Sequence, residues 1–99
     1  MKKRTDNSSA NNEDSDKLLT FPTRFPVKIM GRADANFHKT IMAIVNEYVD
    51  ETHNPEVHER NSGKGNFISI TVTFDAQSQQ QLDDLYQALS DHDKVLMAL

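Results

Sequence analysis

The chain has no cysteine, no tryptophan, and only three glycines and three prolines among 99 residues. Without cysteine, disulfides, thiolate metal ligands and a cysteine nucleophile are all excluded. No apolar run approaches the ~20 residues that a membrane span requires. Eleven Lys and Arg against fifteen Asp and Glu give a formal charge of −4, which argues against a general nucleic-acid binder. These absences favour a small, single-domain cytoplasmic protein that acts without membrane, nucleic acid, metal or cofactor.

The first 17 residues differ in composition from the rest of the chain. Only Met1 and Ala10 are apolar among them, and four basic residues balance four acidic ones. A segment of this kind cannot bury enough surface to offset the entropy cost of ordering it. The basic start Met1–Arg4 lacks the apolar stretch of a signal peptide after it. We therefore predict a disordered polar tail over residues 1–17 and one folded domain over residues 18–99.

The first half of the domain shows a strand pattern followed by a helix pattern. Apolar and polar residues alternate over residues 24–30, which predicts a half-buried strand that Gly31 ends. Asp34 or Asn36 is placed to accept the free N–H groups of a helix that follows. The apolar residues of this helix form one stripe: Phe37, Ile41, Ile44, Val45 and Tyr48. The Asn54-Pro55 pair should stop it, because proline lacks an N–H group.

The second half shows the pattern of a strand hairpin, followed by a helix and a final strand. Pro55–Arg60 is polar apart from an inward-facing Val57, as in an edge strand, and the turn-forming residues Ser62–Asn66 suit a hairpin loop. Alternation over residues 67–74 gives the clearest strand. Asp75 is placed to cap a second helix. The apolar stripe of this helix consists of Leu82, Leu85, Tyr86 and Leu89. Its first turns carry glutamines that we expect to be solvated: Gln77, Gln79, Gln80 and Gln81.

A final strand over Val95–Leu99 completes the order β-α-β-β-α-β. Each helical stripe must be buried, and the alternating strands offer one apolar face for this purpose. Right-handed crossovers place both helices on that face, with the first and third strands central. The sequence thus predicts an α+β ferredoxin-like sandwich with a four-stranded antiparallel sheet.

Four groups of residues, in chain order, carry a resemblance to known proteins. They are Phe21–Thr23 with Phe25–Gly31, Ser62–Phe67 with Ser69, Leu85-Tyr86 with Leu89, and Val95 with Met97 and Leu99. Together they resemble the YbeD-like family, small bacterial proteins of unknown function. The resemblance covers Leu18 to Leu99. It implies the ferredoxin-like fold, akin to the ACT domains that regulate metabolic enzymes by binding small ligands, and it implies no catalytic residue. This chain departs from the family at Phe67, where tyrosine is frequent, and at Leu96, where a polar residue is common.

The open face of the predicted sheet is the main candidate for function. By parity it carries Arg24, Lys28 and Met30 from the first strand, Glu56, His58 and Arg60 from the second, and Phe67, Ser69, Thr71 and Thr73 from the third. Mixed aromatic and basic surfaces are typical of protein interfaces. We predict a non-enzymatic regulatory or adaptor protein. Its partner protein, or a second copy in a homodimer, would bind at Arg24, Lys28, Phe67, Ser69 and Thr71. Strand addition at Val95–Leu99 is a second route.

The alternative is an ACT-like sensor of a small amino or organic acid. In that hypothesis Gly31, Asp34 and Asn36, in the loop after the first strand, would contact the ligand carboxylate through backbone N–H groups. The sequence lacks the residues that RNA binding or metal binding would require. Asn66 and Ile68 stand where RNA-recognition domains place aromatic rings, and His53 and His58 do not share one face as metal ligands would.

Overall fold

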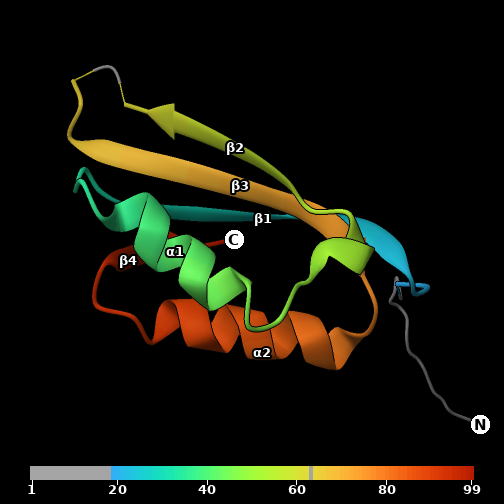
Figure 1. Ribbon diagram of the computed structural model, residues 1–99. Coiled ribbons are helices and arrows are strands. Elements are labelled where there is room, and N and C mark those ends of the chain that lie inside the picture. The colour runs from blue at the N-terminus through green and yellow to red at the C-terminus, as the bar shows by residue number, and fades with distance from the viewer. Residues whose placement is uncertain (1–18, 63) are drawn as a thin grey trace, which may run out of the picture.

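The computed structural model describes residues 19–62 and 64–99, and the predicted tail over residues 1–17 lies outside them. Its elements follow the predicted order (Figure 1). They are β1 Thr23–Arg32, α1 Phe37–Val45, the short 3-10 helix η1 Glu51–His53, β2 Glu56–Asn61, β3 Phe67–Ala76, α2 Gln79–Ser90 and β4 Val95–Ala98. The order β-α-β-β-α-β is therefore confirmed.

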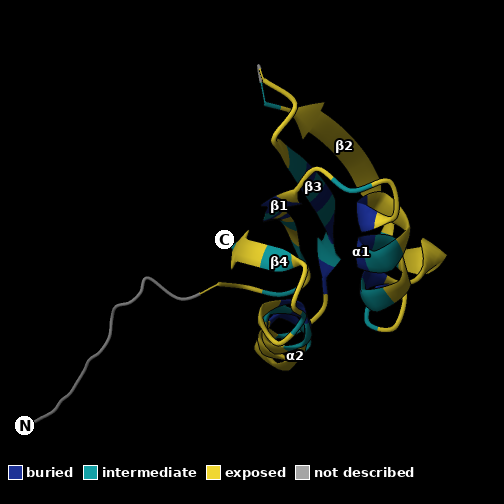
Figure 2. Cartoon of the chain, turned by 90° about the vertical axis from the view of Figure 1, so that its left-hand side faces the viewer, coloured by how far each residue is buried: buried dark blue, intermediate teal, exposed yellow. Residues whose placement is uncertain are grey.

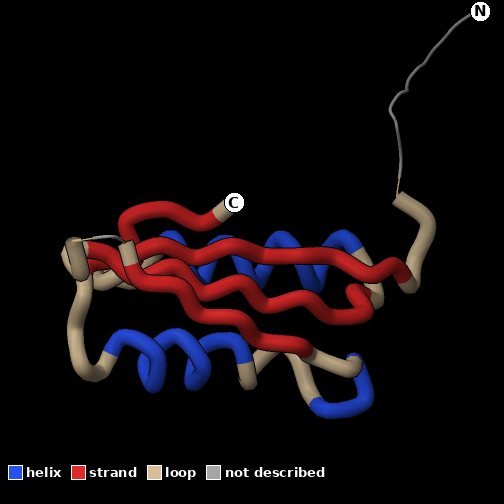
Figure 3. Tube along the Cα trace, turned by 90° about the horizontal axis from the view of Figure 1, so that it is seen from above, coloured by secondary structure: helices blue, strands red, loops and turns tan. Residues whose placement is uncertain are grey.

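The four strands form one antiparallel sheet in the order β2-β3-β1-β4. The two ten-residue strands β1 and β3 are central, as predicted, and they pair along their whole length, with Val27 opposite Val72 and Lys28 opposite Thr71. Seen from above, the strands run side by side, with one helix passing behind them and the other lying along their side (Figure 3). The fold is the predicted ferredoxin-like α+β sandwich.

The core lies between the sheet and the two helices, which cover the same face (Figure 2). Its members alternate along the central strands and recur at helical spacing in α1 and α2. The largest fully buried side chains include Phe37, Ile41, Phe74, Leu82, Leu85 and Leu89. Full burial of each such side chain contributes roughly 1.5–3 kcal/mol. This burial fixes which residues of β1 and β3 remain on the opposite, open face.

The edge strand β2 is exposed along all six residues. Val57 pairs with Val72 and so faces the helix side, as predicted, yet it remains 36% exposed. Neither helix makes a substantial contact with β2. An ion pair between His38 Nδ1 of α1 and Glu59 Oε1, 2.7 Å apart, bridges this gap on the helix side.

Several boundaries differ from the sequence-based expectations. Helix α1 ends at Val45, well before Asn54-Pro55, because a turn follows in which the Val49 N–H donates to the Val45 carbonyl at 2.9 Å. That turn brings Val49 into the core. Asn54 instead ends η1, in the left-handed conformation (φ 53°) that asparagine tolerates.

The start of α2 also differs from the prediction. Asp75 does not cap this helix, because β3 continues to Ala76 and places Asp75 opposite Arg24 in the sheet. Ser78 is the cap, and its side chain accepts from the Gln81 N–H at 3.1 Å. Gln77 precedes the helix. Gln81 is partly buried rather than solvated.

Gly31 lies inside β1 rather than after it, and it allows α1 to approach the sheet closely. A Cβ atom at this position would lie 2.2 Å from Phe37 Cε1 and 2.5 Å from the Lys94 carbonyl oxygen. Real Cβ atoms do not come so close to other heavy atoms. Glycine is therefore required here by the packing of Phe37.

We predict that Gly31→Ala lowers the free energy of unfolding by about 2 kcal/mol or more, the usual range for overpacking a core. Replacing Phe37 with Leu removes two of the three crowding atoms, so Gly31→Ala should cost less in the Phe37→Leu background. Urea unfolding of the wild type, the two single variants and the double variant measures this coupling. Strictly additive costs would show that Phe37 does not require the glycine.

A candidate docking groove on the open face of the sheet

The pairing register decides which side chains share the open face. Across β1 and β3, Lys28 lies opposite Thr71, Met30 opposite Ser69, and Arg32 opposite Phe67. From β2, His58 pairs with Thr71 and Arg60 with Ser69. Val27 and Val72, on the other face, are fully buried. The predicted division of the strands into two faces is confirmed.

A groove of about 220 Å³ lies at the end of this face nearest the β2–β3 hairpin. Among the residues that line it are Lys28, Met30, Arg60, Phe67 and Ser69. Phe67 is 37% exposed. The Arg32 guanidinium lies 6.0 Å from the centre of its ring, at the limit of a cation–π contact. The groove thus combines an apolar surface with basic groups.

The structure brings together only some of the predicted site residues. Lys28, Phe67 and Ser69 line the groove, and Thr71 lies on the same face next to Lys28 without lining it. Arg24 lies toward the opposite end, where Nη1 donates to the Asn54 carbonyl at 2.7 Å. It also forms ion pairs with Asp75 at 3.1 Å and with Glu56 at 3.4 Å.

Arg32 belongs to this site although the sequence pattern did not reveal it. The predicted strand ended at Gly31, whereas the alternation continues for one residue more and places Arg32 on the open face opposite Phe67. The alternation alone would have placed Arg32 on the open face. The signal was hidden because Gly31 resembles a strand end, although it serves helix packing.

Charge is unevenly distributed between the two layers of the fold. Helix α2 contains no Lys or Arg, and its exposed positions include Asp83 and Asp84. By contrast, the residues that line the groove include Lys28 and Arg60 and no carboxylate. Although the chain as a whole is acidic, this end of the open face is basic.

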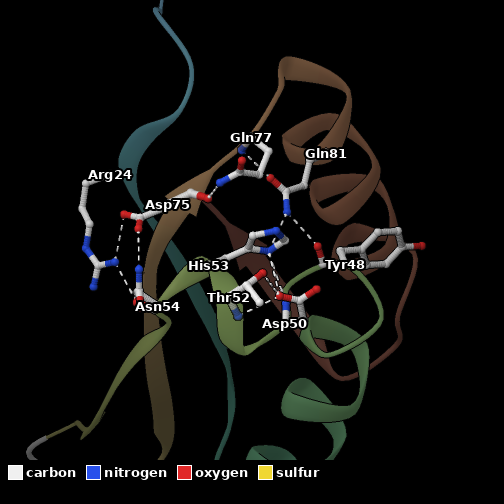
Figure 4. Close-up of polar contacts among 9 residues, drawn as sticks. All are labelled: Arg24, Tyr48, Asp50, Thr52, His53, Asn54, Asp75, Gln77 and Gln81. Carbon is white, nitrogen blue, oxygen red and sulfur yellow. Dashed lines mark hydrogen bonds and ion pairs between the residues drawn. The ribbon is translucent and has the colours of Figure 1, made fainter.

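A polar network at the far end of the sheet joins η1 to its neighbours (Figure 4). On one side, Asn54 Nδ2 donates to Asp75 Oδ2 at 2.8 Å, and Arg24 binds the other oxygen of that carboxylate. On the other side, Gln81 Nε2 donates to the Tyr48 carbonyl at 2.7 Å and lies 3.4 Å from His53 Nδ1. These groups satisfy one another, so the network holds η1 against β3 and α2.

Hydrogen bonds from Asn54 and Arg24 lower the pKa of Asp75 below its ordinary value of 3.8. A carboxyl group whose pKa is lower in the folded state stabilises the fold above its unfolded pKa. That contribution is lost as the pH falls through the folded pKa. Asp34 and Asp50 have lowered pKa values as well, so all three act in the same direction.

We therefore predict that the urea midpoint is constant near neutral pH and decreases below about pH 4. Asp75→Asn cannot gain the stabilisation from ionisation, so its midpoint should be lower at pH 7 and should decrease less on acidification. Unfolding curves from pH 7 to pH 3 measure both effects. An equal acid-induced decrease in the variant and the wild type would contradict this role of Asp75.

The loop after β1 is arranged differently from the predicted sensor site. Gly31 is buried in the strand. In the loop, Asp34 Oδ1 accepts from the Asn36 N–H at 2.8 Å, and Asp34 Oδ2 pairs with Lys94 Nζ. Both contacts lower the pKa of Asp34, and the contact with Lys94 has the larger effect. Asn36 is the N-cap residue of α1, but its side chain makes no capping bond.

A hollow of about 210 Å³ next to this loop is lined by Arg32, Asp34, Asp93, Lys94 and Leu96. Both acidic and basic groups line it, and its Lys94 ammonium already binds a carboxylate of the protein. A carboxylate ligand would have to compete with Asp34 for Lys94, although Arg32 forms no ion pair within residues 19–62 and 64–99. Within residues 19–62 and 64–99, no group of three His, Asp or Glu side chains is placed to hold a metal. No helix in those ranges is long and apolar enough to cross a bilayer.

The sheet order and the single helical layer define the class of the protein, an ACT-like ferredoxin fold. The solution structure of protein HP0495 from H. pylori superimposes with a TM-score of 0.71 at 14% identity, covering 93% of this chain and 97% of that one. The ACT domain from GTP pyrophosphokinase of Chlorobium tepidum gives 0.54 at 12% identity, covering 78% and 97%. At such identities the likeness concerns the fold alone.

The chain belongs to the family described as "Protein of unknown function (DUF493)", which matches residues 16–99. A UPF0250 protein of Paraburkholderia phytofirmans is 40% identical over 85 residues, covering 86% of this chain and 96% of that protein. UPF0250 protein NE1487 of Nitrosomonas europaea is 39% identical over 84 residues, covering 85% and 97%. The predicted resemblance to a bacterial family of unknown function is confirmed.

Proposed function

We propose that this protein is a non-enzymatic regulatory or adaptor module that docks a partner protein through the open face of its sheet. The observation that carries the proposal is the basic and apolar groove at the hairpin end of that face. Exposed aromatic and arginine side chains are enriched in protein interfaces. The helix layer keeps this surface rigid, because the core beneath β1 and β3 is closely packed.

The groove supports binding better than catalysis. The residues that line it include no His, Asp or Glu that could act as a general base. Of its two serines, Ser62 is already used in the hairpin, where Oγ accepts from the N–H groups of Asn66 and Phe67 at 3.1 and 3.2 Å. Ser69 has no His, Asp or Glu among the other lining residues to activate it.

The sensor hypothesis has less support. Lys94, one of the two basic groups that line the hollow, is already paired with Asp34, and Gly31 is buried inside β1. Gly31→Val is not a useful test of this hypothesis, because the added side chain would collide with Phe37. Asp34→Asn, which frees Lys94, is the suitable variant for a ligand screen.

The test of the proposal is a crosslinked pull-down from extract of the native cell. We predict that the wild-type protein recovers a defined protein and that the Lys28→Glu/Phe67→Glu variant loses it. Both side chains are exposed, so the variant should remain folded, which circular dichroism and thermal unfolding can verify. Lys39→Glu is the matched control, because it introduces the same Lys-to-Glu charge change at an exposed position of α1.

A protein recovered by wild type and Lys39→Glu but not by the open-face variant would support docking at this face. Equal recovery by all three baits would contradict it and would direct attention to the β4 edge. A stability increase with a small carboxylate, larger in Asp34→Asn, would favour the sensor instead.

A further inference from the structure

We infer that the groove binds an extended acidic segment of the partner, with one large apolar side chain inserted beside Phe67. This inference rests on the proposed docking function and specifies the chemistry of the partner.

The charge of the groove is uncompensated within the described residues. Arg24 and Lys94, elsewhere on the molecule, form ion pairs with carboxylates of the protein. No such pair involves Lys28, Arg32 or Arg60 in the ranges described. Lys28 and Arg60 line the groove, and Arg32 lies next to it, opposite Phe67. Acidic residues on a bound segment would complement these charges.

The groove also has an apolar surface, so charge alone does not make a bound segment complementary to it. Phe67 and Met30 line it together with Ile68, and Phe67 remains 37% exposed. Covering this surface with an apolar side chain is favourable because it removes apolar area from water. A purely acidic segment would leave it in water. The occupant should therefore carry an aromatic or large aliphatic residue between its acidic ones.

The size of the groove favours a segment of protein over a whole small molecule. About 220 Å³ is below the ~300–1,000 Å³ of pockets that enclose a small-molecule ligand, but it accommodates one side chain. Single-stranded nucleic acid is disfavoured, because successive bases need several stacking rings and Phe67 is the one aromatic residue among those lining the groove.

A phage-displayed library of random dodecapeptides tests the inference directly, because the sequence of the partner does not enter the selection. Selection on the full-length protein should enrich peptides in which Asp and Glu flank an aromatic or large aliphatic residue. Arg60→Glu should bind the enriched peptides at least about tenfold more weakly, measured by fluorescence anisotropy. Lys39→Glu, with an equivalent charge reversal on α1, should bind them as the wild type does.

Several outcomes would overturn the inference. They are the absence of any enriched peptide, enrichment of basic or uncharged peptides, equal affinity when the central residue is changed to alanine, and tighter binding of oligouridylate than of the peptides. If the pull-down still identifies a partner at the open face, the docking function stands and only the acidic specificity is wrong. If the pull-down also fails, both are wrong.

Discussion

The pairing of β1 with β3 is the constraint on which the rest of the structure depends. Ten residues of each strand face one another in an unbroken antiparallel register, and side chains alternate between the two faces. A shift of β1 by one residue against β3 would move Val27 to the open face and turn Lys28 toward the helices, while β3 kept its orientation. The hydrophobic core and the basic groove are therefore two consequences of the same register.

Much of the fold could be predicted because its signals are local and periodic. Alternation identified β1 and β3, and helical spacing identified α1 and α2. Boundaries that depend on tertiary contacts could not be predicted. Asp75 has the side chain of a helix cap, but β3 continues past it to Ala76 and pairs it with Arg24 of β1. Gly31 resembles a strand end, whereas its lack of a side chain accommodates Phe37 from the following helix.

The candidate site shows the same division between local and tertiary signals. Parity predicted which residues share the open face, because alternation alone decides it. The pairing of Arg24 with carboxylates could not be predicted, since it depends on Glu56 and Asp75, which meet Arg24 in space. Those ion pairs neutralise one end of the face, whereas the end near the hairpin remains basic. The open face is thus divided into a self-paired end and an end whose basic side chains form no ion pair within residues 19–62 and 64–99.

The central claim, that the open face docks a protein, is tested most directly by photo-crosslinking in the native cell. Benzoylphenylalanine is placed at Thr71, on the open face beside Lys28, or at Gln80, on the exposed side of α2. The account predicts a discrete crosslinked protein from position 71 and none from position 80. Crosslinks from position 80 but not from position 71 would contradict it, because the helix layer would then be the binding surface.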